Sequence, residues 1–170
     1  MSDVPQHGGS VPLRKRSWIG AIGIGLAVAI VTGILMHLAA KAGLTPFPKP
    51  PSLAFAEILL QRTLPLPIGL LFHAAYVTFW SVVFIRLFPR RTLGTALALA
   101  AALWLGVLAV FFPMFGWGFA GLAISPRMIP ASLVPHVMFG LLLWAFEAWL
   151  PRARGADVFS EPRGAVHASR

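Results

Sequence analysis

The sequence predicts an all-α polytopic membrane protein with four transmembrane helices arranged as two similar helical hairpins. Composition indicates the class: of 170 residues, 58% are hydrophobic and 11% are charged, whereas about 25% of the residues of soluble domains are charged. A spanning helix needs about 20 mostly apolar residues. Four uncharged stretches come close to this length or exceed it, namely 17–40, 63–85, 92–126 and 128–146.

From these stretches we predict one membrane domain, 17–151, between two cytoplasmic tails, 1–16 and 152–170. Its spans are expected at about 17–40, 64–88, 92–112 and 130–150. The stretch 92–126 is too long for one straight crossing. We place the end of its span before Pro113, which lacks an amide hydrogen and is followed by two glycines.

The first span also resembles a secretory signal peptide, because Arg14, Lys15 and Arg16 precede it and AKA at 40–42 resembles a cleavage site. The apolar core of a signal peptide, however, is roughly 7–15 residues long. The uncharged stretch 17–40 is longer. We therefore expect the segment to stay in the mature protein as a membrane anchor.

The connections after spans one and three are apolar. The segment TPFPKPPS predicts a proline-stiffened turn that leads into an apolar helix at about 52–62, with Ser52 as its N-cap. This helix is expected to lie along the outer membrane surface. In the second connection, Trp117 is expected to anchor the chain at the membrane interface.

Positive charges predict the orientation, because basic residues beside short loops are retained on the cytoplasmic side. They precede span one, follow span two and follow span four, so both termini are expected in the cytoplasm. The net charge of +9 also favours contact with anionic headgroups of the lipid bilayer. A nucleic-acid partner would need a soluble basic face, which this sequence lacks. The absence of cysteine excludes disulfides and thiolate sites.

Spans two and four are similar when they are aligned on His73 and His136, because a tryptophan follows each histidine and a Pro-Arg pair closes each span. Spans one and three both carry small residues at every fourth position, a pattern that favours close helix contacts in lipid. These features predict duplicated hairpins and either a homo-oligomer or a partner membrane helix. The two stripes are Ala21, Gly25, Ala29 and Gly33, and Gly94, Ala98, Ala102 and Gly106.

Three histidines, His37, His73 and His136, fall in the outer half of the predicted membrane domain. Ionisable residues inside a membrane usually face the bundle interior and often mark function. One interpretation is structural hydrogen bonding, and a second is a proton-responsive cluster. A third is a metal site with copper or haem b as cofactor, since imidazole binds both. The methionines that would add thioether ligands for copper are Met36, Met114, Met128 and Met138.

Arg86 and Glu147 lie near the cytoplasmic ends of spans two and four, where they are expected to form an ion pair. No nucleophile with a base at recognisable spacing and no phosphate loop is present, so we predict no enzyme. Our first hypothesis is a non-enzymatic membrane protein that responds to protons through the histidines. The alternative is a metal or haem protein in copper handling or electron transfer.

The segments RKRSWIGAIGIGL, FHAAYVTFWSVVFIRLFPRR and PHVMFGLLLWAFEAWLPR resemble the small YagU-like inner-membrane proteins, over roughly residues 14–152. The resemblance implies a location in the bacterial inner membrane and no established reaction. The residues that carry it are His73, Phe88, Pro89, Arg90, Pro113, His136 and Glu147.

Overall fold

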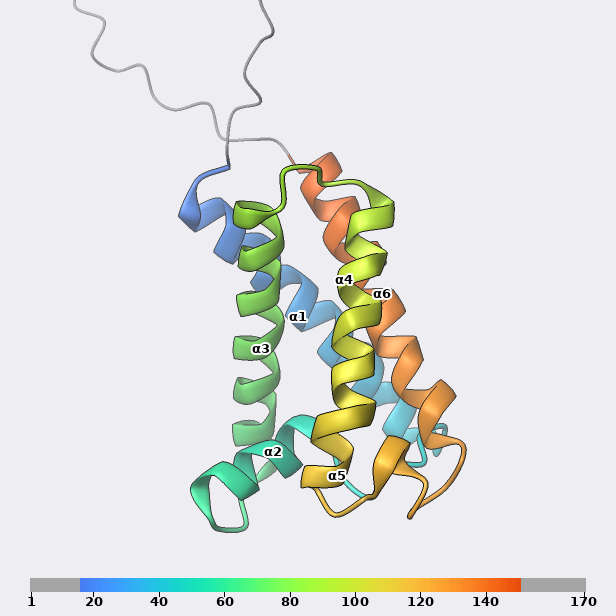
Figure 1. Cartoon of the computed structure of the whole chain (residues 1–170). Helices are drawn as coiled ribbons and strands as arrows, with labels where there is room; N and C mark the ends of the chain where they lie inside the picture. The colour runs from blue at the N-terminus through green and yellow to red at the C-terminus, as the bar shows by residue number, and fades with distance from the viewer. Residues whose placement is uncertain (1–15, 151–170) are drawn as a thin grey trace, which may run out of the picture.

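The computed structural model describes residues 16–150 and contains four helices that are long and apolar enough to cross a membrane (Figure 1). Within these residues there is no strand. The predicted all-α class and its four apolar helices are therefore confirmed. Residues 1–15 and the expected tail 152–170 lie outside the described residues. The four helices are α1 (Trp18–Lys41), α3 (Leu66–Leu87), the continuous segment Leu93–Met114, and α6 (Met128–Trp149).

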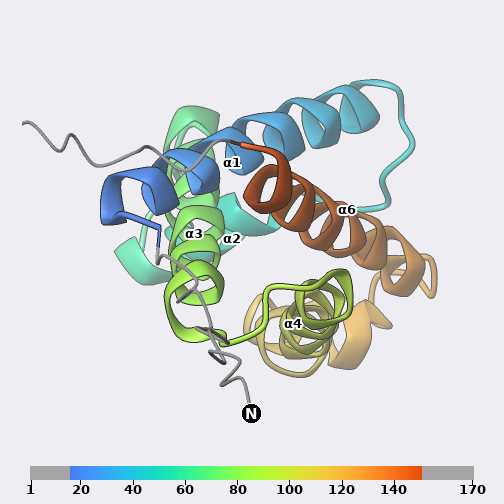
Figure 2. The ribbon, with the colours of Figure 1, turned by 90° about the horizontal axis from the view of Figure 1, so that it is seen from above.

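Helices α1 and α6 each pack against two of the other long helices. Helix α1 packs against α3 and also against α6, while α6 packs against α4 (Leu93–Gly106). Figure 1 shows α1 crossing behind α3 and α4 at a tilt, and Figure 2 shows the same helices from above. Helix α1 begins and α6 ends at one end of the bundle, which we call the terminal end. Helix α2 (Pro51–Leu60) and the short α5 (Phe112–Met114) lie at the other, the α2 end.

The small-residue stripe on α1 is a helix contact face, as the sequence predicted. Ala21 and Ala29 are buried. A Cβ atom added to Gly25 would lie 2.8 Å from the Cα atom of Thr78 on α3. Only a residue without a side chain permits this approach of the two backbones, which in lipid supplies packing that the hydrophobic effect does not.

The second stripe does not pack against another helix of the chain, so its predicted role as a contact face stays a prediction about a partner helix or a second copy. Gly94, Ala98 and Ala102 are exposed. Helix α4 instead turns a different face towards α6, with residues spaced three and four apart as a helical face requires. The buried residues of this face are Ala96, Leu99, Ala100 and Leu103.

The third long helix continues through Pro113 instead of ending before it. Pro113 has no amide hydrogen for the carbonyl group one turn earlier. The amide of Phe112 bonds to the carbonyl oxygen of Val107, five residues back, and the helix widens into the π-helical turn η1 (Val107–Phe111). Helix α5 adds Phe112–Met114, and Gly116, with φ +76°, follows its end.

The connections at the α2 end fold inward against the bundle. Helix α2 has Pro50 as its N-cap, so Ser52 lies inside the first turn instead of capping it. Helix α2 packs so closely on α3 that a Cβ atom on Gly69 would lie 2.7 Å from the Cβ atom of Leu53. Trp117 precedes the short turn η2 (Phe119–Gly121) and is only 6% exposed. The expectation of an interfacial anchor at Trp117 is therefore wrong.

Candidate functional site

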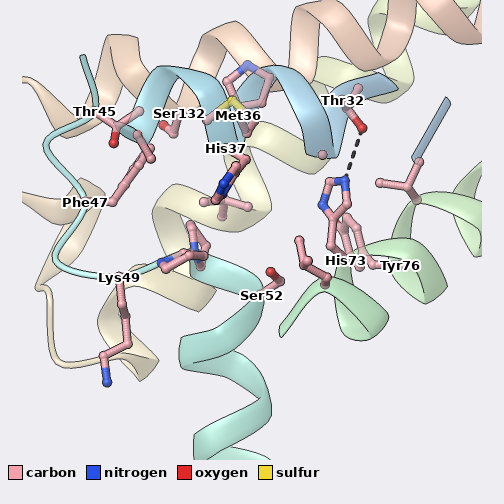
Figure 3. A pocket seen from close by; sticks show the side chains of 18 of the residues that line it. Thr32, Met36, His37, Thr45, Phe47, Lys49, Ser52, His73, Tyr76 and Ser132 are labelled. Carbon is pink, nitrogen blue, oxygen red and sulfur yellow. Dashed lines mark hydrogen bonds between the residues drawn. The ribbon is translucent and has the colours of Figure 1, made fainter. Parts of the chain in front are cut away.

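A cavity of about 450 Å³ lies among α1, α3, α6 and the connection between α1 and α2 (Figure 3). This volume is within the range of about 300–1,000 Å³ that is typical of small-molecule sites. Apolar residues such as Leu66, Leu103 and Phe139 form much of the wall. The polar lining residues are Thr32, His37, Thr45, Lys49, Ser52, His73, Tyr76, Ser132 and His136.

All three histidines that the sequence analysis named line this one cavity. His37 comes from α1 and is exposed, whereas His73 on α3 and His136 on α6 are half-buried. Figure 3 shows the rings of His37 and His73 beside the same space. They meet because α1 packs against both α3 and α6. The three histidines, which the sequence places in the same half of the membrane domain, therefore line the same cavity.

The three imidazoles share a cavity without forming a metal-binding group. Among residues 16–150, no three His, Cys, Asp or Glu side chains lie close enough together to hold a metal ion. Met36 lines the cavity, whereas Met114 is exposed and Met128 is fully buried outside the lining. Met138 is half-buried and also lies outside it. The copper and haem b interpretations gain no support from this arrangement.

His73 links α3 to α1 through Thr32. Its Nε2 atom lies 3.1 Å from Thr32 Oγ1. The Thr32 hydroxyl has two carbonyl oxygens as acceptors, that of Val28 at 2.8 Å and that of Ala29 at 3.2 Å. We therefore assign the proton of the neutral His73 ring to Nε2, which faces Thr32, and this assignment leaves Nδ1 as an acceptor. In Figure 3 this second nitrogen points away from Thr32, towards the side of the cavity where His37 lies.

His136 bonds to its own helix. Its Nδ1 atom lies 2.7 Å from the carbonyl oxygen of Ser132. Because a carbonyl oxygen only accepts, Nδ1 carries a proton, and Nε2 of the neutral ring is an acceptor. The Ser132 hydroxyl is already engaged, since it accepts from Trp104 Nε1 at 3.1 Å and donates to the carbonyl oxygen of Ile129 at 3.0 Å. The unused polar atom of this group is therefore His136 Nε2.

The π-helical turn shapes one wall of the cavity. Val107, the first residue of η1, and Phe112, which follows the turn, both line it. Single π-helical turns are frequent at functional sites. Since Pro113 removes the regular hydrogen bond at this point, it influences the cavity wall without lining the cavity itself.

The connection between α1 and α2 forms the α2 end of the cavity. Phe47 stacks with Trp117 at a ring-centroid distance of 6.4 Å. Lys49 Nζ lies 2.6 Å from Glu57 Oε2, and Glu57 Oε1 accepts from the Leu64 amide at 3.1 Å. Lys49, together with this amide, holds the pKa of Glu57 below its ordinary value of 4.5. The connection is thus held by an aromatic contact and by an ion pair.

A charge cluster lies at the terminal end and comprises Arg16, Arg86, Arg91 and Glu147. Arg16 Nε donates to Glu147 Oε2 at 2.7 Å, and Arg91 Nη1 donates to Glu147 Oε1 at 2.7 Å. Arg16 also donates to the carbonyl oxygen of Leu150 at 2.9 Å. Since helix carbonyls at a C-terminus lack helical partners, Arg16 acts as a cap for α6.

Arg86 is linked to this cluster through the backbone. We expected an ion pair between Arg86 and Glu147, whereas the salt bridges above join Glu147 to Arg16 and Arg91. Arg86 Nη1 donates to the carbonyl oxygen of Arg16 at 2.8 Å. Its guanidinium carbon lies 4.2 Å from the ring centroid of Trp18, within cation–π range.

Sequence reasoning named the histidines but missed their partners Thr32 and Ser132. Ser132 lies four residues before His136, one helical turn away, so a spacing argument would have found it. Thr32 and His73 are 41 residues apart on different helices, and only packing joins them. Arg16 was interpreted only as a signal of membrane orientation, because basic residues commonly precede a membrane span. Its ion pair with Glu147 was not predicted.

Comparison of the chain with protein-family models, curated proteins and solved structures found no match. The resemblance to the YagU-like family therefore rests on the sequence motifs alone. Two of the motif residues, His73 and His136, line the cavity, and Glu147 belongs to the charge cluster. The geometry of the cavity is thus the basis for a functional proposal.

Proposed function

We propose that this chain is a small, non-enzymatic protein of the bacterial inner membrane that responds to protons through its histidine-lined cavity. The observation that carries the proposal is that His37, His73 and His136 line one cavity in which no described lining residue is Asp or Glu. Protons taken up by these imidazoles would place positive charge in a mostly apolar space without a carboxylate to balance it. Like charges in a medium of low dielectric repel strongly. Proton uptake is therefore coupled to opening or hydration of the cavity.

The hydrogen bonds of the Thr32 and Ser132 hydroxyl groups support the proposal that the protein is not an enzyme. Thr32 and His73 are within hydrogen-bond distance, as a nucleophile and its base would be. The Thr32 hydroxyl, however, also lies 2.8 Å from the carbonyl oxygen of Val28, which competes with His73 for its proton. Ser132 is likewise engaged on both sides. Neither hydroxyl is arranged for attack on a substrate.

The proposed orientation places both termini in the cytoplasm. Arg16 and Leu150, at the two ends of the described chain, are hydrogen-bonded at the terminal end. Arg90 and Arg91 lie in the loop at this same end, as cytoplasmic retention of positive charge favours. The cavity then belongs to the outer half of the membrane. Reporter fusions to the two tails test this: both should report the cytoplasm, and tails on opposite sides would contradict it.

The two-hairpin organisation and self-association belong to the same proposal. Helix α1 packs with α3, and α4 packs with α6, and these contacts support the proposal of two hairpins. The second helix of each pair brings a histidine to the cavity. The exposed stripe of Gly94, Ala98 and Ala102 offers a small-residue face for a second copy of the chain or a partner helix.

The proton response can be measured by cysteine labelling, because the natural chain has no cysteine. Met36→Cys places one thiol on the cavity lining. Leu44→Cys, at a position that is 75% exposed and outside the lining, corrects for the effect of pH on thiol chemistry. The rates of reaction with a water-soluble maleimide are compared in liposomes at about pH 5.5 and pH 8, on either side of the ordinary histidine pKa.

The expected result is a severalfold rise in the relative labelling rate of the Met36→Cys variant under acidic conditions. The rise should disappear when His73→Gln and His136→Gln are added, since glutamine hydrogen-bonds but does not take up a proton in this range. A relative rate for Met36→Cys that is the same at both pH values would show that the cavity does not respond to protons.

A further inference from the structure

We propose that the cavity binds a neutral, lipid-soluble molecule of the phenol class, with an aromatic body and a hydroxyl group that donates to His73 or His136. This goes beyond proton response, because binding requires the neutral histidines and no structural change. The inference depends on three properties of the cavity: its wall, its unused hydrogen-bonding atoms and its charge.

The wall favours an apolar aromatic body. Four aromatic side chains from four separate parts of the chain line the cavity, and aliphatic residues line it as well. Aromatic pairs contribute stabilisation beyond that of their buried area. The volume of about 450 Å³ is sufficient for a small aromatic molecule. The aromatic lining residues are Phe47, Tyr76, Phe112 and Phe139.

The unused hydrogen-bonding atoms of the two half-buried histidines are acceptors. His73 Nε2 lies 3.1 Å from Thr32 Oγ1, and His136 Nδ1 lies 2.7 Å from the carbonyl oxygen of Ser132, so we assign the ring protons to these two nitrogens. Each neutral ring therefore has one remaining nitrogen lone pair. A ligand that satisfies these atoms must donate hydrogen bonds, as a hydroxyl group does and as a ketone or an ether does not.

The charge of the lining favours a neutral ligand. None of the described lining residues is Asp or Glu, so a cation would find no carboxylate. Lys49 is the lining residue with a permanent positive charge, and its ammonium group is already paired with Glu57 at 2.6 Å. An anion would face the lone pairs of neutral imidazoles. Two imidazole nitrogens are also fewer than the four ligands that a structural metal site uses.

The test compares two probes that differ in one hydrogen-bond donor. The first is 2-naphthol, and the second is 2-methoxynaphthalene, which keeps the two rings and the oxygen but has no donor. Binding to the purified full-length protein in detergent is measured by fluorescence at about pH 7.5, above the ordinary histidine pKa. Partition of each probe into empty micelles is subtracted.

The expected result is that 2-naphthol binds about tenfold more tightly than 2-methoxynaphthalene, which corresponds to the net value of one or two neutral hydrogen bonds. The double variant His73→Phe, His136→Phe removes both acceptors and keeps ring-sized side chains. It should bind the two probes equally, and retained binding of 2-methoxynaphthalene shows that it is folded. The control Leu44→Phe adds a ring at a position that is 75% exposed and outside the lining, and it should keep the tenfold preference.

Two outcomes would overturn the proposal. In the first, the natural protein shows no preference for 2-naphthol beyond that of empty micelles, as expected if the cavity holds only lipid chains. In the second, the preference survives in the double variant. Should that variant fail to fold, Leu103→Trp fills the cavity from another wall. This substitution should weaken the binding of both probes, and unchanged affinities would show that the probes bind outside the cavity. A proton response that fails while the naphthol preference holds would leave this proposal standing.

Discussion

Arg16 and Glu147 are 131 residues apart in the chain and form a buried ion pair, with Arg16 Nε donating to Glu147 Oε2 at 2.7 Å. Their exposed fractions are 7% and 2%. The pair joins the residue before the N-cap of α1 to the last turn of α6, and Arg91 links the loop between α3 and α4 to the same carboxylate. Ion pairs thus hold the helices together at the terminal end of the bundle, while the cavity lies towards the α2 end.

Replacement of Glu147 should strongly destabilise the fold. Glu147→Gln removes the negative charge that forms ion pairs with buried Arg16 and with Arg91. Removing one partner of a buried pair costs about 3–5 kcal/mol. The measurement is denaturant unfolding of the purified protein in detergent. Glu57→Gln, which removes a carboxylate from a surface pair, is the control and should change the free energy of unfolding little. Equal effects of the two substitutions would contradict a structural role for the charge cluster.

Arg90 and Arg91 provide a matched pair for the same cluster. Each substitution to Gln removes one positive charge from the same loop, so effects on membrane orientation are equal. Only Arg91 bonds to Glu147, while Arg90 is exposed. Arg91→Gln should lower the thermal midpoint by several degrees, and Arg90→Gln should leave it within error. The prediction fails if Arg90→Gln is as destabilising as Arg91→Gln.

The contact of α1 with α3 predicts opposite outcomes at two nearby glycines. A Cβ atom on Gly25 would lie 2.8 Å from the backbone of Thr78, whereas nothing lies within 4 Å of one on Gly23. Gly25→Ala should therefore cost about 1–3 kcal/mol through overpacking. Gly23→Ala should be neutral or stabilising, because alanine is the better helix former. Chemical unfolding of the two variants measures the difference, and a stable Gly25→Ala variant would argue against the close approach.

The pair of Lys49 and Glu57 predicts a pH dependence of the α1–α2 connection. The pKa of Glu57 is lowered from 4.5 by Lys49 and the Leu64 amide. The ionised Glu57 carboxylate therefore stabilises the connection, and this stabilisation is complete at pH values above the pKa that Glu57 has in the unfolded chain. It is lost as the pH falls through the lower pKa that Glu57 has in the folded protein. Lys49→Gln should move the Glu57 pKa up towards 4.5, measured by NMR titration of the side-chain carboxyl. Arg62→Gln, at an exposed cation nearby, should leave it unchanged.

The helical class and the number of apolar helices followed from composition and length, because hydrocarbon requires apolar side chains and satisfied backbone bonds along every crossing. The histidines were also recognisable, since an ionisable residue is rare in such segments. Their positions near the ends of spans placed them at one depth. Local patterns were sufficient for these inferences because each depends on residues within a single segment.

Tertiary packing decided which of these residues meet. Thr32 reaches His73, and Arg16 reaches Glu147, only because α1 lies against both α3 and α6. The stripe at Gly25 packs while the similar stripe at Ala98 is exposed, although the two patterns look alike in the sequence. In an apolar helix nearly every face is hydrophobic, so periodicity does not mark the buried one. The contacts between helices select it, and they produce the cavity that the sequence alone did not show.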